Sequence, residues 1–196
     1  MDAAVGFSDE PDTDKACAQV VAQLQATVQA RGPAQVAIVF ATADHAEQVR
    51  RLLARLRLGL GHPVVWGCST TSVISPQGEH EGGVGLGVLA LWGVSGKAAL
   101  VSGAPGAQAF LEEAGASKGS VVLAVPDPRR LDAALLSTLL QSQSRPSPVV
   151  VAGGGQSGTE QGFFGLSNAD AGEGVCPLLS LGGVEALVQV TQGVQP

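Results

Sequence analysis

Glycine and small hydroxyl side chains gather in two segments of the sequence, Gly67–Ser72 and Gly153–Gly158. Each follows a short apolar run, 63–67 in the first case and 148–153 in the second. Backbone amides and hydroxyls presented beyond the carboxyl end of a buried strand are typical of a small-molecule site, although either segment alone also suits a turn whose hydroxyls bond their own backbone. We expect the two segments to meet in one cleft. The predicted ligand-binding residues are Trp66, Gly67, Cys68, Ser69, Thr70, Thr71, Gly153, Gly154, Gly155 and Ser157, with His45 close by.

The same residues offer little for catalysis. Cys68 or Ser69 could act as a nucleophile, and His45 beside Asp44 is the best-placed base, but the G-x-S-x-G elbow is absent. A histidine in the first turn of a helix is more often solvated than catalytic. The triple glycine fits neither a dinucleotide fingerprint nor a phosphate-binding P-loop, so no nucleotide is predicted. We expect a binding protein with no catalytic residues, and a hydrolase is one alternative.

No metal site is predicted either. The three cysteines include no C-x-x-C pair and have no histidine at ligand spacing. The segment Glu79-His80-Glu81 lies in a polar stretch flanked by glycine and is expected to be an exposed turn. Free cysteines in odd number suit a reducing compartment.

Charge and hydropathy exclude two classes of partner. The net charge is −6, which provides no basic surface for nucleic acid or an anionic membrane. The four arginines between Arg50 and Arg57 fit the solvated face of one helix. No apolar run approaches the roughly 20 residues of a membrane span, and the N-terminus lacks a signal-peptide pattern. We expect a soluble protein in the cytoplasm, or inside an organelle after removal of a transit peptide.

Two β-α-β units would position the candidate residues. In the first, a helix over 14–31 precedes a strand over 36–41, a helix from Asp44 to Leu60 and a strand over 63–67. In the second, a strand over 121–125 precedes a helix that opens at Asp127-Pro128 and carries Leu131, Leu135 and Leu139, and a strand over 148–153 follows. From the first Val of the first strand to the Pro before the second strand, the interval is the same in both units (63 − 36 = 148 − 121 = 27). This spacing suggests a pseudo-repeat of halves 1–104 and 105–196, although any two ordinary units would look alike.

Hairpins complete the predicted fold. Segments 83–92 and 97–101 are expected to pair as antiparallel strands, and a second pair is expected around Phe163-Phe164 and 184–190. Gly83, Gly85 and Gly87 alternate, so their shared face should be flat, and either another element or a planar ligand should pack on it. The sequence therefore predicts a single α/β domain over 1–196, a layered mixed sheet of two β-α-β units plus hairpins with helices packed on the sheet.

The chain resembles a known family, the FIST N-terminal domain. The resemblance rests on Val39-Phe40 followed by Asp44-His45, on Val64–Thr71, which contains the specific Gly-Cys-Ser-Thr segment, on 83–91, and on 148–155. It continues to the closing segment 191–196 and so covers almost the whole chain.

This resemblance implies a sensory domain for small ligands such as amino acids, as found in bacterial signalling proteins and some eukaryotic F-box proteins. Some bacterial relatives bind haem and report nitric oxide, and here only His45 matches a motif position. Related proteins usually continue into a C-terminal FIST domain that this sequence lacks, so the missing domain or a partner protein is expected to complete the site. The alternative function is a scaffold or assembly factor that docks another protein.

Overall fold

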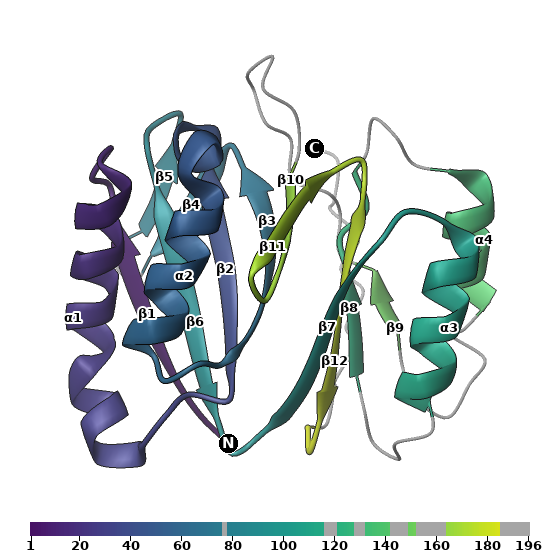
Figure 1. Cartoon of the computed structure of the whole chain (residues 1–196), viewed down its shortest axis with the longest axis horizontal. Coiled ribbons are helices and arrows are strands. Elements are labelled where there is room, and N and C mark those ends of the chain that lie inside the picture. Colours follow the sequence, from purple (N-terminus) through teal and green to yellow (C-terminus); the bar gives the residue numbers. More distant parts are fainter. Residues whose placement is uncertain (76–77, 116–120, 128–131, 142–148, 152–163, 185–196) are drawn as a thin grey trace, which may run out of the picture.

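The computed structural model describes residues 1–75, 78–115, 121–127, 132–141, 149–151 and 164–184. Its elements form four layers, with a pair of helices on the outer face of each of two packed β-sheets (Figure 1). The helices on one side are α1 (Thr13–Arg31) and α2 (Val49–Gly59), and those on the other are α3 (Ala104–Gly115) and α4 (Ala133–Gln141). The predicted α/β class is confirmed.

The first sheet has six strands in the order β1-β6-β2-β3-β10-β11. The second has the order β7-β12-β8-β9, and β4 and β5 form a separate two-stranded ribbon. The strands of the first sheet are β1 (Asp2–Ser8), β2 (Val36–Thr42), β3 (Val64–Thr70), β6 (Leu86–Trp92), β10 (Phe164–Ser167) and β11 (Asp170–Glu173). The others are β7 (Ser95–Val101), β8 (Val121–Ala124), β9 (Val149–Val151), β12 (Cys176–Gly182), β4 (Ser72–Ser75) and β5 (Gly78–Glu81).

The first helix forms as its sequence predicts. Asp12 caps α1 by accepting a hydrogen bond from the Lys15 amide at 2.9 Å, and Gly32, with a φ of +81°, ends it. Residues Ala16, Val20 and Leu24 of α1 have no exposed surface. Their spacing places them on one stripe that packs on the six-stranded sheet.

The second predicted helix is divided in two. Residues Ala43–Gln48 form a 3₁₀ helix, η1, and α2 begins only at Val49. The Asp44 carboxylate accepts a hydrogen bond from the Thr42 hydroxyl at 2.8 Å. The leucines at 52, 53, 56 and 60, which recur at helical spacing, are fully buried.

Both β-α-β units are confirmed as parallel strand pairs, in different sheets. In the first unit Val36 lies opposite Val64, and in the second Val122 lies opposite Val149. The described part of the second helix begins at Ala133, whose neighbour Asp132 accepts a hydrogen bond from the Ala134 amide at 3.0 Å. Pro128 and Leu131 of the prediction lie outside the described residues.

The predicted hairpin of segments 83–92 and 97–101 is wrong. β6 belongs to the six-stranded sheet, whereas β7 crosses to the second sheet and pairs with β12. The link between them contains Gly93, with a φ of +76°, and Val94, which is buried between the sheets. Burial of Val94 in this core directs the chain away from β6. The strand that contains Phe164 was predicted to pair with 184–190, but β10 pairs with β3 and β11. Of the segment 184–190, only Val184 is among the described residues.

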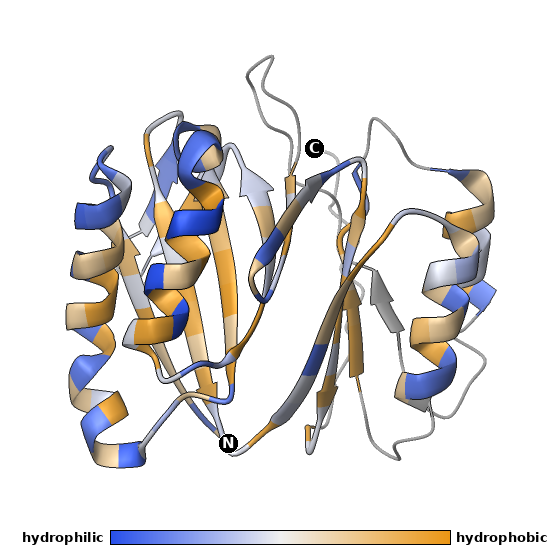
Figure 2. Ribbon diagram, viewed as in Figure 1, coloured by the Kyte–Doolittle hydropathy of each residue, from blue (hydrophilic) through white to orange (hydrophobic). Residues whose placement is uncertain are grey.

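Three apolar clusters hold the layers together. One lies between α1, α2 and the six-stranded sheet, and another between α3, α4 and the four-stranded sheet. The third fills the space between the two sheets with Val36, Trp66, Leu91, Leu179 and Leu181 among its members. In Figure 2, β2, β6 and β8 are coloured mainly as hydrophobic, whereas the outer helices carry many hydrophilic residues.

The absence of side chains at Gly85 and Gly87 makes room for the side chain of Val73. A Cβ on Gly85 would lie 3.0 Å from Val73 of β4, and one on Gly87 would lie 2.5 Å from the same side chain. The predicted close packing is therefore confirmed at these two positions, and its source is the β4–β5 ribbon. Nothing lies within 4 Å of the corresponding position on Gly83. No described helix is long and apolar enough to cross a membrane.

Candidate functional site

The segment from Gly67 to Thr70 is not the loop that the sequence predicts, because β3 continues to Thr70. Strand residues alternate between faces. Trp66 and Cys68 belong to the core between the sheets, whereas Ser69 lies opposite Ala41 on the face covered by the helices. The segment therefore cannot present all its side chains to one cleft. Hydroxyl residues suggested a turn, but here they continue a strand buried on both faces.

Gly67 serves the packing of strands. A Cβ at this position would overlap the carbonyl oxygen of Val39 on the adjacent strand. Thr70 is half-buried and Thr71 is exposed. The remaining predicted residues, Gly153, Gly154, Gly155 and Ser157, lie outside the described residues, so the predicted meeting of the two segments remains a prediction.

Ser69 connects the predicted segment to a cleft that the sequence analysis missed. Its side chain has no exposed surface, and its Oγ accepts a hydrogen bond from the Phe164 amide at 3.0 Å. This bond fixes the start of β10 against β3. Phe164 in turn lines a cleft of about 650 Å³ between η1, the start of α2 and the β10–β11 hairpin.

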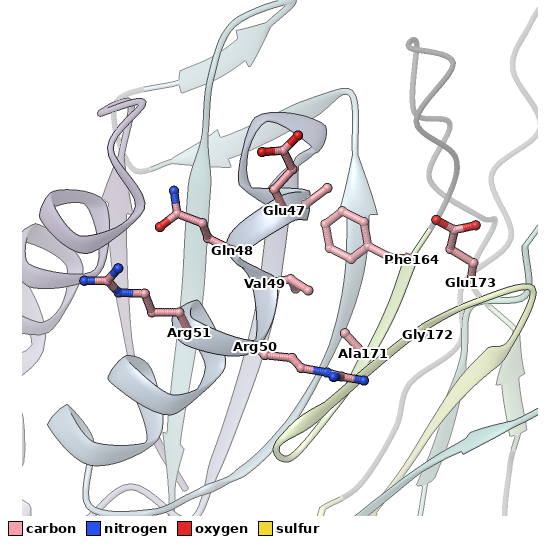
Figure 3. A pocket seen from close by; sticks show the side chains of 10 residues that line it. Glu47, Gln48, Val49, Arg50, Arg51, Phe164, Ala171, Gly172 and Glu173 are labelled. Atoms are coloured by element: carbon pink, nitrogen blue, oxygen red, sulfur yellow. The ribbon is translucent and has the colours of Figure 1, made fainter.

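We call this space the η1–β11 cleft (Figure 3). Arg50 reaches across it toward Ala171, the Phe164 ring points toward η1, and Gln48 and Arg51 point the other way, toward α1. The full lining consists of Ala46, Glu47, Gln48, Val49, Arg50, Arg51, Phe164, Ala171, Gly172 and Glu173.

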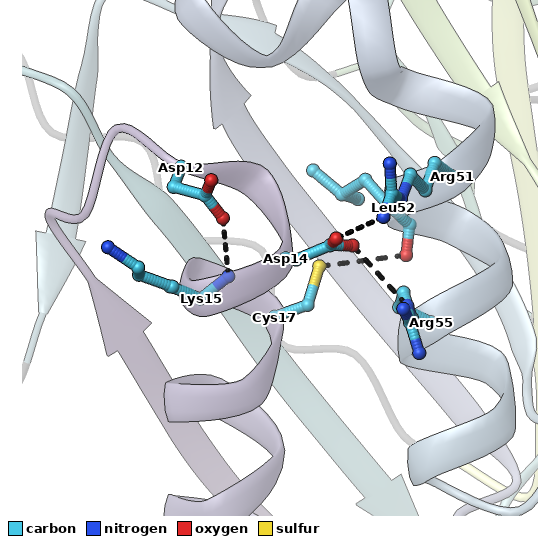
Figure 4. Close-up of polar contacts among 7 residues, drawn as sticks. All are labelled: Asp12, Asp14, Lys15, Cys17, Arg51, Leu52 and Arg55. Carbon is cyan, nitrogen blue, oxygen red and sulfur yellow. Dashed lines mark hydrogen bonds and ion pairs between the residues drawn. The ribbon is translucent and has the colours of Figure 1, made fainter.

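The cleft has charges of both signs at its border. Within the described parts of the chain, Arg50, Glu47 and Glu173 make no ion pair. Arg51 is different, because its guanidinium pairs with the Asp14 carboxylate of α1 (Figure 4). The cleft thus keeps one cationic and two anionic side chains available to a bound molecule.

Side-chain contacts join η1 and the start of α2, which form one wall of the cleft, to the N-terminal part of α1. Asp14 also binds Arg55 at 3.3 Å, and the Cys17 thiol lies 3.8 Å from the Leu52 carbonyl oxygen (Figure 4). A third contact joins the Thr13 hydroxyl to His45 Nδ1 at 2.9 Å. These contacts fix η1 and the start of α2 relative to α1.

His45 is buried, and the expectation that it is solvated is wrong. It has no exposed surface, because η1 turns it under α1 toward Thr13. Burial lowers the pKa of its imidazole below the ordinary value of 6.5, while the neighbouring Asp44 carboxylate acts in the opposite direction. Its Nε2 has no hydrogen-bond partner among the described residues.

A second hollow, the Phe40 groove, lies on the opposite face of the six-stranded sheet. It measures about 440 Å³ and is mainly apolar. The Phe40 side chain stacks edge-on against Trp66, with 6.4 Å between ring centroids, and Ile74 of β4 is 77% exposed. Thr70 is the predicted site residue that lines this groove.

The described residues offer no metal cluster, and two of the three cysteines have thiols that burial keeps protonated. No group of three histidine, cysteine or acidic residues is positioned to hold a metal ion in the part of the chain that the structure describes. Burial raises the pKa of Cys17 and Cys176 to about 12, so both remain protonated near neutral pH. Glu79–Glu81, expected to be an exposed turn, forms β5, in which His80 bonds the Ser75 hydroxyl at 2.9 Å and stacks on Phe7.

Among the described residues, the two hollows provide no side chain of the kind that commonly ligates haem iron. Neither the η1–β11 cleft nor the Phe40 groove has a histidine, cysteine or methionine in its lining. His45, the residue that the family resemblance singles out, is sealed beneath Thr13.

Sequence reasoning missed Arg50, Phe164 and Glu173. The first was assigned to a solvated helix face, and the other two lie in short segments without a recognisable motif. Only the pairing of β10 with β3 brings them together, more than 100 positions apart in the sequence (164 − 50 = 114).

Comparison with known proteins identifies the family. The FIST N domain model matches residues 35–196. No curated protein matches the chain. Among solved structures, a cyanuric acid hydrolase from A. caulinodans aligns with 12% sequence identity and a TM-score of 0.40, over 91% of this chain and 70% of that one.

Proposed function

Because the chain belongs to the FIST N domain family of sensory signal-transduction domains, we propose that it binds a small polar metabolite in the η1–β11 cleft. The observation that carries this proposal is a set of charged side chains without ion-pair partners among the described residues, placed around the aromatic ring of Phe164. Arg50, Glu47 and Glu173 border the cleft without ion pairs among the described residues, and Phe164 forms its inner side. Ligand sites commonly combine an apolar surface with a few polar groups that fix orientation.

An amino acid suits this arrangement. Its carboxylate would pair with the Arg50 guanidinium, which can form two parallel hydrogen bonds. Its ammonium group would pair with Glu47 or Glu173, and an apolar side chain would contact Phe164. A volume of about 650 Å³ accommodates a molecule of this size.

The proposed role is binding without catalysis. The Ser69 hydroxyl accepts a hydrogen bond from the Phe164 amide, and the His45 imidazole forms a hydrogen bond with the Thr13 hydroxyl. Ser69 and His45 are therefore not arranged as a nucleophile and its general base. Cys68 lies on the other face of β3.

The test is a thermal-unfolding screen with the twenty amino acids and other small charged metabolites. A ligand at about one hundred times its Kd adds about 2.7 kcal/mol to the stability of the native state, so it raises Tm. Arg50→Gln should abolish the rise produced by a carboxylate-bearing hit. Arg31→Gln is the matched control, since Arg31 pairs with Asp2 at the far end of α1.

If no compound in the screen raises Tm, or if Arg50→Gln keeps the full response, the η1–β11 cleft is not the ligand site.

A docking function is the second candidate, and the Phe40 groove favours it. Val5, Phe40 and Ile74 expose 43%, 36% and 77% of their surfaces around this hollow, and contiguous apolar surface is a common mark of protein contacts. Replacing Ile74 with Ser should abolish the pull-down of a folded partner protein. The same substitution should leave the Tm shift produced by metabolites unchanged. A partner that still binds the Ile74→Ser protein would contradict this second function.

A further inference from the structure

His45 stands directly behind the wall of the η1–β11 cleft. The three residues that follow it, Ala46, Glu47 and Gln48, all line the cleft. Its own side chain points to the other side, where Nδ1 lies 2.9 Å from the buried hydroxyl of Thr13. Either neutral tautomer keeps this bond, because a hydroxyl can donate or accept. One of the contacts that hold the wall on α1 is therefore made by a buried imidazole.

Among the described acids on the elements around His45, Glu47 of η1 makes no ion pair, but it lines the cleft, and Asp44 is the carboxylate that acts on the imidazole. Strands β2 and β3 contain no Asp, Glu, Lys or Arg. On α1, the Asp12 carboxylate caps the helix through the Lys15 amide, and the Asp14 carboxylate is engaged by the arginines of α2.

Within η1, Asp44 is the neighbouring acid, and its carboxylate accepts the Thr42 hydroxyl. A second proton on His45 would give both ring nitrogens an N–H, yet no described atom accepts from Nε2. A buried cation with an unpaired donor is costly, and exposure to water removes that cost.

We propose that His45 is a proton switch for the cleft wall, which holds η1 against Thr13 when the ring is neutral and releases η1 from α1 when the ring is protonated. Release would withdraw Ala46, Glu47 and Gln48 from the cleft, so ligand binding would weaken in acid. The relevance to ligand binding rests on the proposed function, whereas the movement of η1 does not. Because burial lowers the pKa of His45 below the ordinary value of 6.5, the wall is held at neutral pH and released in acid.

The experiment measures amide hydrogen-exchange protection factors in the full chain without ligand, at about pH 7.5 and about pH 5. Protection over 43–48 should fall by about tenfold or more in acid, while protection in β2 and β6 stays constant. His45→Asn, which keeps a hydrogen-bonding side chain but cannot titrate in this range, should show no such fall. The matched control is His62→Asn, because His62 is exposed and its φ of +64° suits asparagine. This variant should behave as the wild type.

Equal loss of protection in wild type and His45→Asn would overturn the proposal, as would constant protection of 43–48 in the wild type. Should His45→Asn fail to fold, the imidazole resonances of the wild type can be titrated by NMR instead. The switch requires the His45 ring and the amides of 46–48 to titrate with one midpoint, and separate midpoints would refute it. A protein that shows the switch but binds no metabolite would refute the proposed function alone.

Discussion

At the scale of single residues, His45 should make stability depend on pH. Its pKa in the folded protein lies below the unfolded value of 6.5, so the unfolded chain binds more protons at acidic pH. The contribution of the neutral ring is therefore complete above about pH 6.5 and is lost as pH falls through the folded pKa, at about 1.4 kcal/mol for each unit of difference. Urea unfolding at a series of pH values should show this loss in the wild type and a flatter profile in His45→Asn, and parallel profiles would contradict the assignment.

Ser69 should matter for stability through one hydrogen bond. Replacing it with Ala removes the acceptor of the buried Phe164 amide and leaves that donor unpaired, which costs about 1–3 kcal/mol. The measurement is the free energy of unfolding in urea. Ser72→Ala is the control, because Ser72 is only half-buried and its own amide is bound by Thr70. An effect of Ser69→Ala no larger than that of Ser72→Ala would show that the bond contributes little.

At the scale of elements, the sequence predicted the β-α-β units better than their partners. Continuous apolar runs such as 36–41 predict buried strands and the helices between them, and these were confirmed. The pairing of the strands was not predictable in the same way, because a run of apolar residues does not specify which strand will pair with it. Val94 illustrates this limit, since its burial between the sheets separates β6 from β7.

The candidate site shows the same limit at the level of its residues. Hydroxyl residues after Gly67 suggested a loop, and the strand instead places Ser69 under β10. The residues of the η1–β11 cleft come from elements distant in sequence, so their charges acquire meaning only when β10 pairs with β3.

The packing of the β4–β5 ribbon on β6 can be tested with a glycine. Gly87→Ala would place a Cβ 2.5 Å from Val73, and such overpacking costs about 1–3 kcal/mol. Adding Val73→Ala should recover part of that cost, so the double mutant should be more stable than the sum of the two single effects predicts. Gly83→Ala is the control, because nothing lies within 4 Å of its added methyl group. Strict additivity of Gly87→Ala and Val73→Ala would mean that the ribbon does not rest on this glycine.

At the scale of the whole molecule, the two sheets exchange strands across the predicted halves. β7 precedes residue 104 but belongs to the four-stranded sheet, whereas β10 and β11 follow residue 105 and extend the six-stranded sheet. A fragment of residues 1–104 would thus expose the edge of β3 and lack a partner for β7. This exchange favours one cooperative domain over two independent halves.

Adjacent residues of β12 allow that cooperativity to be measured. Leu179 is buried between the two sheets and Leu178 is buried beneath α3 and α4, so each reports on a different core. Replacing either with Ala should cost about 2–5 kcal/mol. If the layers unfold as one unit, fluorescence of Trp66 and Trp92 in the first sheet and circular dichroism of the whole chain should report a single coincident transition that both substitutions lower. A Leu178→Ala protein whose tryptophan transition stays at the wild-type midpoint while the circular dichroism transition moves would instead establish two separately folding parts.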